Sequence, residues 1–311
     1  MAVVVFGSIN MDLVVRAPRL PAPAESLPGH EFYTAGGGKG ANQAVAAARL
    51  NIPTKMIGRV GGDNFGVELR RNLAEVGVDT SGILTDPETT SGVALIAVDD
   101  TAQNSIIFVH GANGRVNRTD VDRLEAHLAG ARVLLLQLEV PLEASLAAAR
   151  LAHQKGVIVI LDPAPAQELP PDFYKLLDII TPNEVEAGQL VGFPVKTEED
   201  ALRAANILLD RGAKTALVKM GALGVAYATR TEQSEPTQGF LPAFKVQAVD
   251  TVAAGDAFNG GLAVGLVEGQ PLEVAVRWGA ATGALSATRP GAQPSMPDRA
   301  EFEAFLKERS V

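Results

Sequence analysis

The chain has 311 residues, of which 47% are hydrophobic and 20% are charged, and its formal net charge is −9. This composition can bury a large core and does not indicate disorder. Because no cysteine is present, disulfides, thiolate-bound zinc, iron–sulfur clusters and thiol catalysis are excluded. The acidic balance, without any clustered Lys/Arg run, argues against nucleic acid as a partner.

No feature of the sequence indicates a membrane or export. No basic region precedes the apolar segment Val3–Phe6, so we expect no secretory signal. Lys219, Asp256 and Glu268 interrupt the longer apolar stretches, so we expect no transmembrane helix. The sequence therefore predicts a cytoplasmic protein with no membrane partner.

Short runs rich in Val, Ile and Leu alternate along the chain with Ala-rich segments of helical periodicity. Continuous apolar runs are typical of strands covered on both faces, and they occupy residues 3–6, 55–60, 133–138, 157–161, 179–181 and 216–220. The helical patterns occupy residues 40–50, 65–76, 142–153, 198–211, 256–268 and 272–288. This alternation predicts an α/β fold with a doubly wound, mostly parallel sheet flanked by helices.

Two segments interrupt the alternation and favour short strands. Residues 12–34 are rich in proline, and residues 91–110 have the pattern of a hairpin with a polar turn. We expect both to be strand insertions that form a small accessory β-sheet. The remainder predicts one α/β domain over residues 1–311.

Polar residues follow the first predicted strand, in the string Gly-Ser-Ile-Asn-Met-Asp at residues 7–12. Ligands of a doubly wound sheet bind beyond the carboxyl ends of its strands. Alternation along the chain puts Asn10 and Asp12 on one face, and such a pair suits vicinal hydroxyl groups. A plain turn at the strand end is the alternative, and the residues alone favour it without excluding the ligand site.

A glycine-rich turn at residues 36–43 (Gly-Gly-Gly-Lys-Gly-Ala-Asn-Gln) precedes the first predicted helix. It fails the P-loop template, because Lys39 is followed by Gly40 rather than Ser or Thr. It also fails the dinucleotide fingerprint, because Ala41 stands where the third glycine belongs. The turn can still bring backbone amides to a polyhydroxyl ligand, with Asn42 as a hydrogen-bonding group. A flexible turn before a helix is the alternative.

Two weaker signals lie further along the chain. Glu139 ends a strongly apolar run, so a carboxylate is expected near a strand end. Asn183 and Glu186 have the spacing of a helix capping box, which explains them without a ligand. Their oxygens also suit a hard cation such as Mg²⁺ held through water.

The strongest signal is the string Asp-Thr-Val-Ala-Ala-Gly-Asp at residues 250–256, which runs into an apolar helix. Small residues at a helix start leave free backbone N–H groups facing one point, and the helix dipole favours an anion there. A carboxylate at Asp256 would repel a phosphate, but its presence is explained if it accepts a proton from an attacking hydroxyl. The alternative is that Asp256 caps the helix.

Together these segments resemble the ribokinase family, within the PfkB group of carbohydrate kinases. Residues 37–44 and 250–256 are similar to its N-terminal and C-terminal signatures, in the same order and about 210 residues apart. The Asp-Pro-Ala-Pro-Ala string at residues 162–166 adds to a likeness that covers essentially the whole chain. The resemblance implies an α/β fold with a β-sheet lid, and ATP-dependent phosphorylation of D-ribose at O5. Another pentose or a nucleoside, such as 2-deoxyribose, is the alternative acceptor.

The resemblance also implies roles for individual residues. Asp256 is the implied catalytic base, and the backbone N–H groups of Ala253, Ala254 and Gly255 are the implied anion hole. The implied sugar contacts are Asn10, Asp12, Gly38, Lys39, Asn42, Glu139 and Asp256. The implied nucleotide contacts are Asn183, Lys219, Gly221, Gly224 and Gly255. Mg²⁺ is implied near Asn183 and Glu186 through water. A monovalent cation, usually K⁺, is implied at Asp250, Val252, Ser286, Arg289, Gly291 and Ser295.

Three positions depart from the family pattern. Ala253 stands where many members have Gly, Asp162 where Asn is expected, and Lys219 where Thr is usual. The last two departures affect the expected nucleotide contacts, while the expected base remains.

The resemblance implies ribose and ATP as ligands and a homodimer formed through the lid. Two other classes of protein are alternatives. One is a non-catalytic sugar or nucleoside sensor on the same fold, against which the presence of Asp256 and Gly255 argues. The other is a dinucleotide-dependent oxidoreductase, against which the missing fingerprint after the first strand argues.

Overall fold

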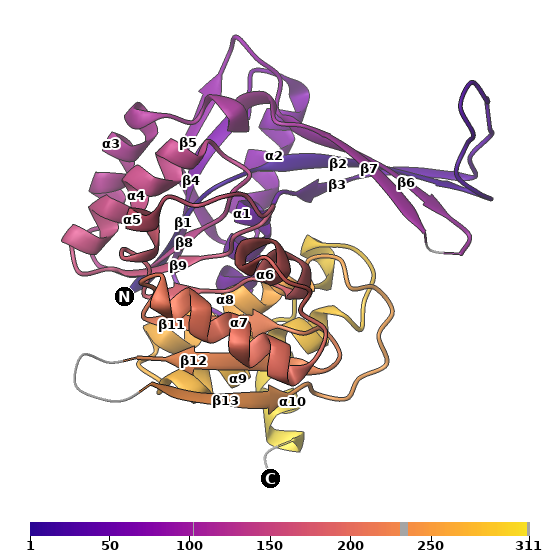
Figure 1. Cartoon of the computed structure of the whole chain (residues 1–311). Helices are drawn as coiled ribbons and strands as arrows, with labels where there is room; N and C mark the ends of the chain where they lie inside the picture. Colours follow the sequence, from indigo (N-terminus) through magenta and orange to yellow (C-terminus); the bar gives the residue numbers. More distant parts are fainter. Residues whose placement is uncertain (102, 231–235, 310–311) are drawn as a thin grey trace.

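The computed structural model describes residues 1–101, 103–230 and 236–309. Its largest sheet is built from β1 (Ala2–Phe6), β4 (Thr54–Gly61), β5 (Val78–Asp86), β8 (Ala131–Leu136), β9 (Ile158–Leu161), β10 (Ile179–Ile180), β11 (Thr215–Lys219), β12 (Gly224–Thr229) and β13 (Thr237–Pro242). These nine strands lie in the order β13-β12-β11-β10-β9-β8-β1-β4-β5 (Figure 1). The strands from β11 to β5 are parallel, and β12 and β13 add an antiparallel edge. The predicted doubly wound, mostly parallel sheet is confirmed.

Helices cover both faces of this sheet, because the side chains of each strand alternate between two apolar cores. Val4 and Phe6 pack into one core, which is completed by α3 (Arg118–His127), α4 (Leu142–Gln154), α5 (Pro171–Tyr174), α6 (Glu184–Val191) and α7 (Glu198–Asp210). Val3 and Val5 pack into the other core, which is completed by α1 (Lys39–Arg49), α2 (Asn64–Glu75), α8 (Ala254–Val267), α9 (Leu272–Ser286) and α10 (Arg299–Glu308). Within the described residues, no helix combines the length and the apolar character that crossing a bilayer requires.

A second sheet of four strands projects from the body of the molecule (Figure 1). We call it the lid; it consists of β2 (Asn10–Ala17), β3 (Glu31–Gly37), β6 (Gly92–Asp99) and β7 (Asn104–Val109). The order is β3-β2-β6-β7, with β2 and β6 parallel and the outer pairs antiparallel. The predicted small accessory sheet is therefore confirmed. Asn10 and Asp12 belong to a lid strand, so the interpretation of residues 7–12 as only a strand-end turn is wrong.

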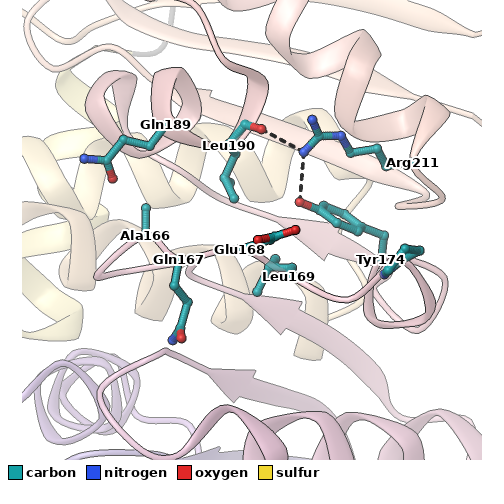
Figure 2. A pocket seen from close by; sticks show the side chains of 9 residues that line it. Ala166, Gln167, Glu168, Leu169, Tyr174, Gln189, Leu190 and Arg211 are labelled. Atoms are coloured by element: carbon teal, nitrogen blue, oxygen red, sulfur yellow. Dashed lines mark hydrogen bonds between the residues drawn. The ribbon is translucent and has the colours of Figure 1, made fainter.

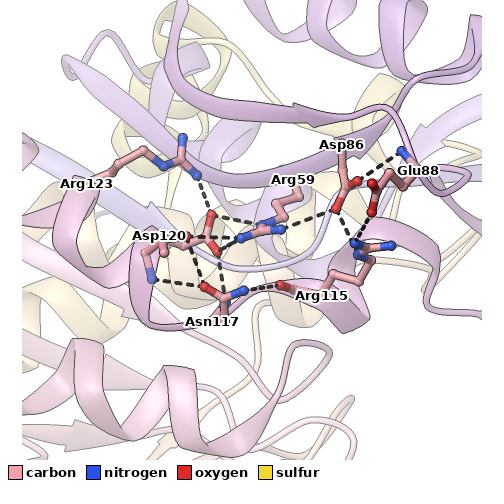
Figure 3. Close-up of polar contacts among 8 residues, drawn as sticks. Arg59, Asp86, Glu88, Arg115, Asn117, Asp120 and Arg123 are labelled. Carbon is pink, nitrogen blue, oxygen red and sulfur yellow. Dashed lines mark hydrogen bonds and ion pairs between the residues drawn. The ribbon is translucent and has the colours of Figure 1, made fainter.

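A buried cluster of ions joins the two chain segments that lead into and out of the lid hairpin (Figure 3). Arg59 on β4 lies 3.2 Å from Asp86, at the end of β5, and 2.7 Å from Asp120 on α3. Arg115, which follows β7, lies 3.0 Å from Asp86 and 2.9 Å from Glu88. One arginine of the central sheet therefore anchors both ends of the hairpin β6–β7.

Candidate active site

The carboxyl ends of the parallel strands open onto a cavity of about 690 Å³. Its wall includes Lys39 from the glycine-rich turn and Asp256 from α8, together with Gly221 after β11 and Gly224 at the start of β12. A cavity of this size at this edge of a doubly wound sheet is suited to small-molecule ligands.

Asp256 lies in the first turn of α8, and its side chain is buried. The residue that precedes the helix is Ala253, and no side chain caps the helix there. The interpretation of Asp256 as a helix cap is therefore wrong. Its carboxylate instead accepts hydrogen bonds from Asn42 Nδ2 at 2.9 Å and from Gln43 Nε2 at 3.1 Å. These bonds join the start of α8 to the start of α1.

The backbone before Asp256 presents N–H groups at the cavity wall. Ala253 has φ +57°, a left-handed conformation that is uncommon for a residue with a Cβ. Ala254 donates its N–H to Thr251 O at 3.2 Å, so this group already has a partner. In the described part of the chain the N–H groups of Ala253 and Gly255 donate to no other group. Two of the three expected anion-hole donors are therefore available to a ligand.

Several charges surround Asp256. Burial raises the pKa of Asp256 to about 6; Lys39 opposes this shift, and Asp162 adds to it. A carboxylate with this pKa is suited to accept a proton near neutral pH. Burial lowers the pKa of Lys39, but Asp256, Asp162, Glu139 and Glu186 together raise it above its ordinary value. Lys39 is therefore a permanent cation.

The residues expected to contact the sugar come from three segments. Asn10 and Asp12 lie on β2 of the lid, and burial raises the pKa of Asp12 to about 7, with Glu139 and Asp256 adding to the shift. Glu139 Oε2, beyond β8, accepts a hydrogen bond from Lys39 N at 3.0 Å. The structure thus brings lid, turn and strand end together around one point.

Gly38 allows this close approach. It has φ +86°, and a Cβ there would lie 2.8 Å from Asn10 N. Both the conformation and the space require glycine.

Sequence reasoning assigned no role to several polar side chains of the site. Gln43 is fully buried and contacts Asp256, and Gln293 Nε2 donates to Asn42 Oδ1 at 3.3 Å. Asn113 donates to Asn10 Oδ1 at 2.7 Å. Gln43 lies inside the recognised turn and could have been considered, whereas no local pattern marks Asn113 or Gln293.

The residues expected to contact the nucleotide all line the cavity: Asn183, Lys219, Gly221, Gly224 and Gly255. Asn183 and Glu186 form a reciprocal capping box, with both bonds 2.8 Å long, so their structural interpretation is correct. Glu186 also lines the cavity. Burial and Asp162 raise its pKa, while Lys219 opposes the shift. Gly221 and Gly224 form the turn after β11 with φ +52° and +136°.

The donor set fits a magnesium ion that arrives with phosphates. In the described ranges, no three His, Asp or Glu side chains are grouped to hold a metal by themselves. Glu186 brings a carboxylate to the cavity wall. Mg²⁺ commonly keeps several waters and uses one or two carboxylates plus substrate phosphates.

The six positions expected near K⁺ lie where residues 250–252 meet residues 286–295. Asp250 accepts hydrogen bonds from Val252 N and Gly291 N, both at 2.9 Å. Ser286 Oγ and Ser295 Oγ lie 2.7 Å apart. The Arg289 side chain pairs with Glu301 at 2.7 Å, while its N–H bonds Ser286 O at 3.1 Å. Each oxygen of Asp250 thus accepts one backbone hydrogen bond, and together these bonds close the loop.

A second cavity, of about 700 Å³, lies between α6 and the segment after β9 (Figure 2). Arg211 is the cation in its lining, and it donates to Tyr174 Oη at 3.1 Å and Leu190 O at 2.8 Å. The guanidinium of Arg211 is therefore already bonded, and none of the described residues that line this hollow is a lysine, in contrast to the first cavity.

The fold and the first cavity define a phosphotransferase that acts on a small hydroxylated substrate. The chain matches the family model described as pfkB family carbohydrate kinase over residues 2–299. It is 43% identical over 303 residues to ribokinase of Haemophilus influenzae, with 97% of each chain covered. It is 38% identical over 307 residues to deoxyribokinase of Salmonella typhimurium, covering 98% of this chain and 99% of the relative. It is also similar to the structure of Arabidopsis thaliana ribokinase complexed with ribose and ATP, with a TM-score of 0.88, 35% identity and 98% of each chain covered. The chain belongs to the pfkB family of carbohydrate kinases.

Proposed function

We propose that this enzyme transfers the γ-phosphoryl group of ATP to O5 of D-ribose. The observation that carries the proposal is the buried Asp256 carboxylate, held by Asn42 and Gln43 beside a cavity lined by Lys39 and Lys219. The similarity to ribokinases named for ribose supports this acceptor.

Phosphoryl transfer depends on alignment and charge neutralisation more than on covalent chemistry by the protein. O5 forms a bond to the γ-phosphorus while the bond from that phosphorus to the bridging oxygen breaks, and ADP leaves. A primary alcohol is far less acidic than a carboxylic acid, so Asp256 orients the hydroxyl and accepts its proton as the new bond forms. The N–H groups of Ala253 and Gly255 stabilise the charge on the transferring group.

Mg²⁺ is the proposed partner of ATP in this cavity. When bound, it neutralises charge on the phosphates, and Glu186, next to Asn183, would hold it through water. The cavity needs such help, because its described lining has four carboxylates and three ammonium groups. The carboxylates belong to Asp162, Glu184, Glu186 and Asp256, and the ammonium groups belong to Lys39, Lys219 and Lys245.

A monovalent cation, K⁺, is proposed at the junction of residues 250–252 and 286–295. This junction lies directly before the anion-hole residues, so an ion there would stiffen the backbone that carries Ala253 and Gly255. Activity should rise when KCl replaces an equal concentration of tetramethylammonium chloride, and an equal rate in both salts would contradict the K⁺ site.

2-Deoxyribose is the second candidate acceptor, because one relative is a deoxyribokinase. Asn10 and Asp12 lie on one face of β2 and suit vicinal hydroxyl groups, which favours ribose. A site built to hydrogen-bond a hydroxyl discriminates strongly against an analogue that lacks it.

The lid is proposed to close over the sugar and to join two subunits. Asp12, Ala94 and Phe108 lie on its inner face, and Leu13, Leu95 and Ile107 lie on its outer face. Phe32 and Ile107 are 64% and 65% exposed on the outer face, and exposed apolar side chains gathered in this way are typical of a protein interface. We propose a homodimer formed there, in the cytoplasm where ATP is available.

A substrate panel tests the proposed function. Ribose, 2-deoxyribose, fructose and adenosine are each supplied with ATP and Mg²⁺, and ADP release is followed by a coupled assay. The highest kcat/KM is expected with ribose. A higher value with 2-deoxyribose would favour the second candidate, and no ADP release with any acceptor would favour a sugar sensor.

A further inference from the structure

An ion pair joins Asp162 and Lys219 on the cavity wall. Lys219 Nζ lies 2.9 Å from Asp162 Oδ1, and the two side chains are 12% and 4% exposed. Lys219 ends β11, and Asp162 directly follows β9. The contact therefore joins the ends of two strands that are separated by β10.

The second carboxylate oxygen of Asp162, Oδ2, is connected to Asp256 through the side chain of Gln43. Gln43 Nε2 donates both to Asp162 Oδ2, at 3.0 Å, and to Asp256 Oδ1, at 3.1 Å. Gln43 Oε1 accepts a hydrogen bond from Gln137 Nε2 at 2.7 Å, which fixes the direction of the amide. If the Gln43 amide rotated away, the buried carboxylates of Asp162 and Asp256 would each lose a hydrogen-bond donor.

Lys219 also faces the expected phosphate position. A Cβ at Gly255 would lie 3.3 Å from Lys219 Nζ, so the ammonium lies beside the N-terminus of α8. The N–H groups of Ala253 and Gly255 favour an anion at this point. The ammonium therefore has the Asp162 carboxylate on one side and the anion position on the other.

We propose that Lys219, Asp162 and Gln43 act as one unit that links the phosphate end of the cavity to the base. Lys219 contacts the transferring phosphoryl group, Asp162 holds Lys219 and Gln43 in place, and Gln43 orients the Asp256 carboxylate toward the sugar hydroxyl. The proposal rests on the kinase function above and adds Asp162 and Gln43 as positioning residues.

A double-mutant cycle tests the link. Lys219→Thr, Asp162→Asn and the double variant are assayed for kcat and for KM of ATP. Lys219→Thr leaves a buried carboxylate unpaired beside the phosphates, so kcat/KM for ATP should fall about 100-fold. Adding Asp162→Asn should restore about tenfold of this loss, because it removes the unpaired charge.

The pH profile distinguishes positioning of the base from a merely structural role. Asp162→Asn removes a charge that repels ionised Asp256, so the acid limb of kcat/KM should move to lower pH by about half a unit. Gln43→Leu removes a donor to the Asp256 carboxylate, so its acid limb should move to higher pH. Opposite shifts from two neighbouring substitutions are not expected from a general loss of packing.

The pair of Lys214 and Asp178 supplies a matched control. Lys214 Nζ lies 2.8 Å from Asp178 Oδ1 at the opposite end of β11, outside the cavity lining. Lys214→Thr and Asp178→Asn should leave kcat, KM and the pH profile unchanged.

Two results would overturn the proposal. The first is a loss of kcat/KM in the double variant equal to the product of the losses in Lys219→Thr and Asp162→Asn. The second is an acid limb of kcat/KM that stays at the same pH in both Asp162→Asn and Gln43→Leu. Thermal unfolding followed by circular dichroism shows whether each variant is folded. If Gln43→Leu does not fold, the cycle and the Asp162→Asn profile decide the outcome. If the unsubstituted enzyme releases no ADP with ribose, the proposed function fails. If it does release ADP but the effects of Lys219→Thr and Asp162→Asn are independent, only the proposed link fails.

Discussion

Asn42 Nδ2 donates a hydrogen bond of 2.9 Å to Asp256 Oδ2, although the two residues are 214 positions apart in the sequence. The bond joins the glycine-rich turn before α1 to the small-residue turn before α8. Asp256 is thereby held where residues expected to contact sugar and nucleotide meet. The predictions below depend on this arrangement.

Asp256→Asn should lower kcat for ribose phosphorylation by about 10³-fold, because general-base catalysis contributes roughly 10²–10⁴. The amide has nearly the same shape, so KM for ribose and for ATP should change only a few-fold. Steady-state kinetics and calorimetric binding of ribose measure the two effects. Asp122→Asn, at an exposed position on α3, is the control, and near-normal turnover of Asp256→Asn would remove Asp256 from the role of base.

The pH dependence of kcat/KM should have a steep acid limb. Asp256 accepts a proton only when ionised, and its pKa is about 6, so activity falls as the pH drops through this value. Asp12, with a pKa of about 7, loses its charge in the same range and no longer accepts a hydrogen bond from the sugar as a carboxylate. The slope should therefore exceed tenfold per pH unit, and Asp12→Asn should reduce it to tenfold; a slope that Asp12→Asn does not alter would contradict the assignment.

Arg59→Met should destabilise the fold by about 3–5 kcal/mol, because it removes the buried cation between the carboxylates of Asp86 and Asp120. These carboxylates then keep only the more exposed Arg115 and Arg123 as partners. Urea unfolding measures the change. Arg150→Met is the matched control, since Arg150 pairs with Asp172 at the surface with both side chains exposed; its effect should be within about 1 kcal/mol. Equal effects at both sites would mean that burial of the cluster adds no stability.

Ile107→Lys should dissociate the proposed homodimer, because it puts a charge at the centre of the exposed outer face of the lid. Sedimentation velocity should show a shift from two chains to one at micromolar protein. Val67→Lys changes an exposed apolar residue of α2, outside the lid, and should leave the sedimentation coefficient unchanged. If the unsubstituted protein sediments only as a monomer, the proposed dimer is contradicted.

The sequence predicted those elements whose local signal is strong. The runs that became β1, β8 and β9 are continuous and apolar, and α1, α4 and α7 have clear periodicity with Ala-rich faces. By contrast, β5 contains Gly82 and is only partly buried, and β12 and β13 form an antiparallel edge. These strands are completed by their neighbours in the sheet, so local patterns gave no sufficient signal for them.

Some features of the candidate site could likewise be predicted from the sequence, and others could not. Residues 36–43 and 250–256 could be recognised from the sequence because tight turns before helices require glycine and other small residues in consecutive positions. Whether Asp256 caps its helix or faces a cavity was open, since both alternatives use the same residue at the same position. Only the tertiary structure decided this, because Asn42 and Gln43 approach Asp256 through packing of α1 against α8. The pairing of Asp162 with Lys219 was likewise decided by the parallel order of β9, β10 and β11, which brings together two strand ends that are distant in the chain.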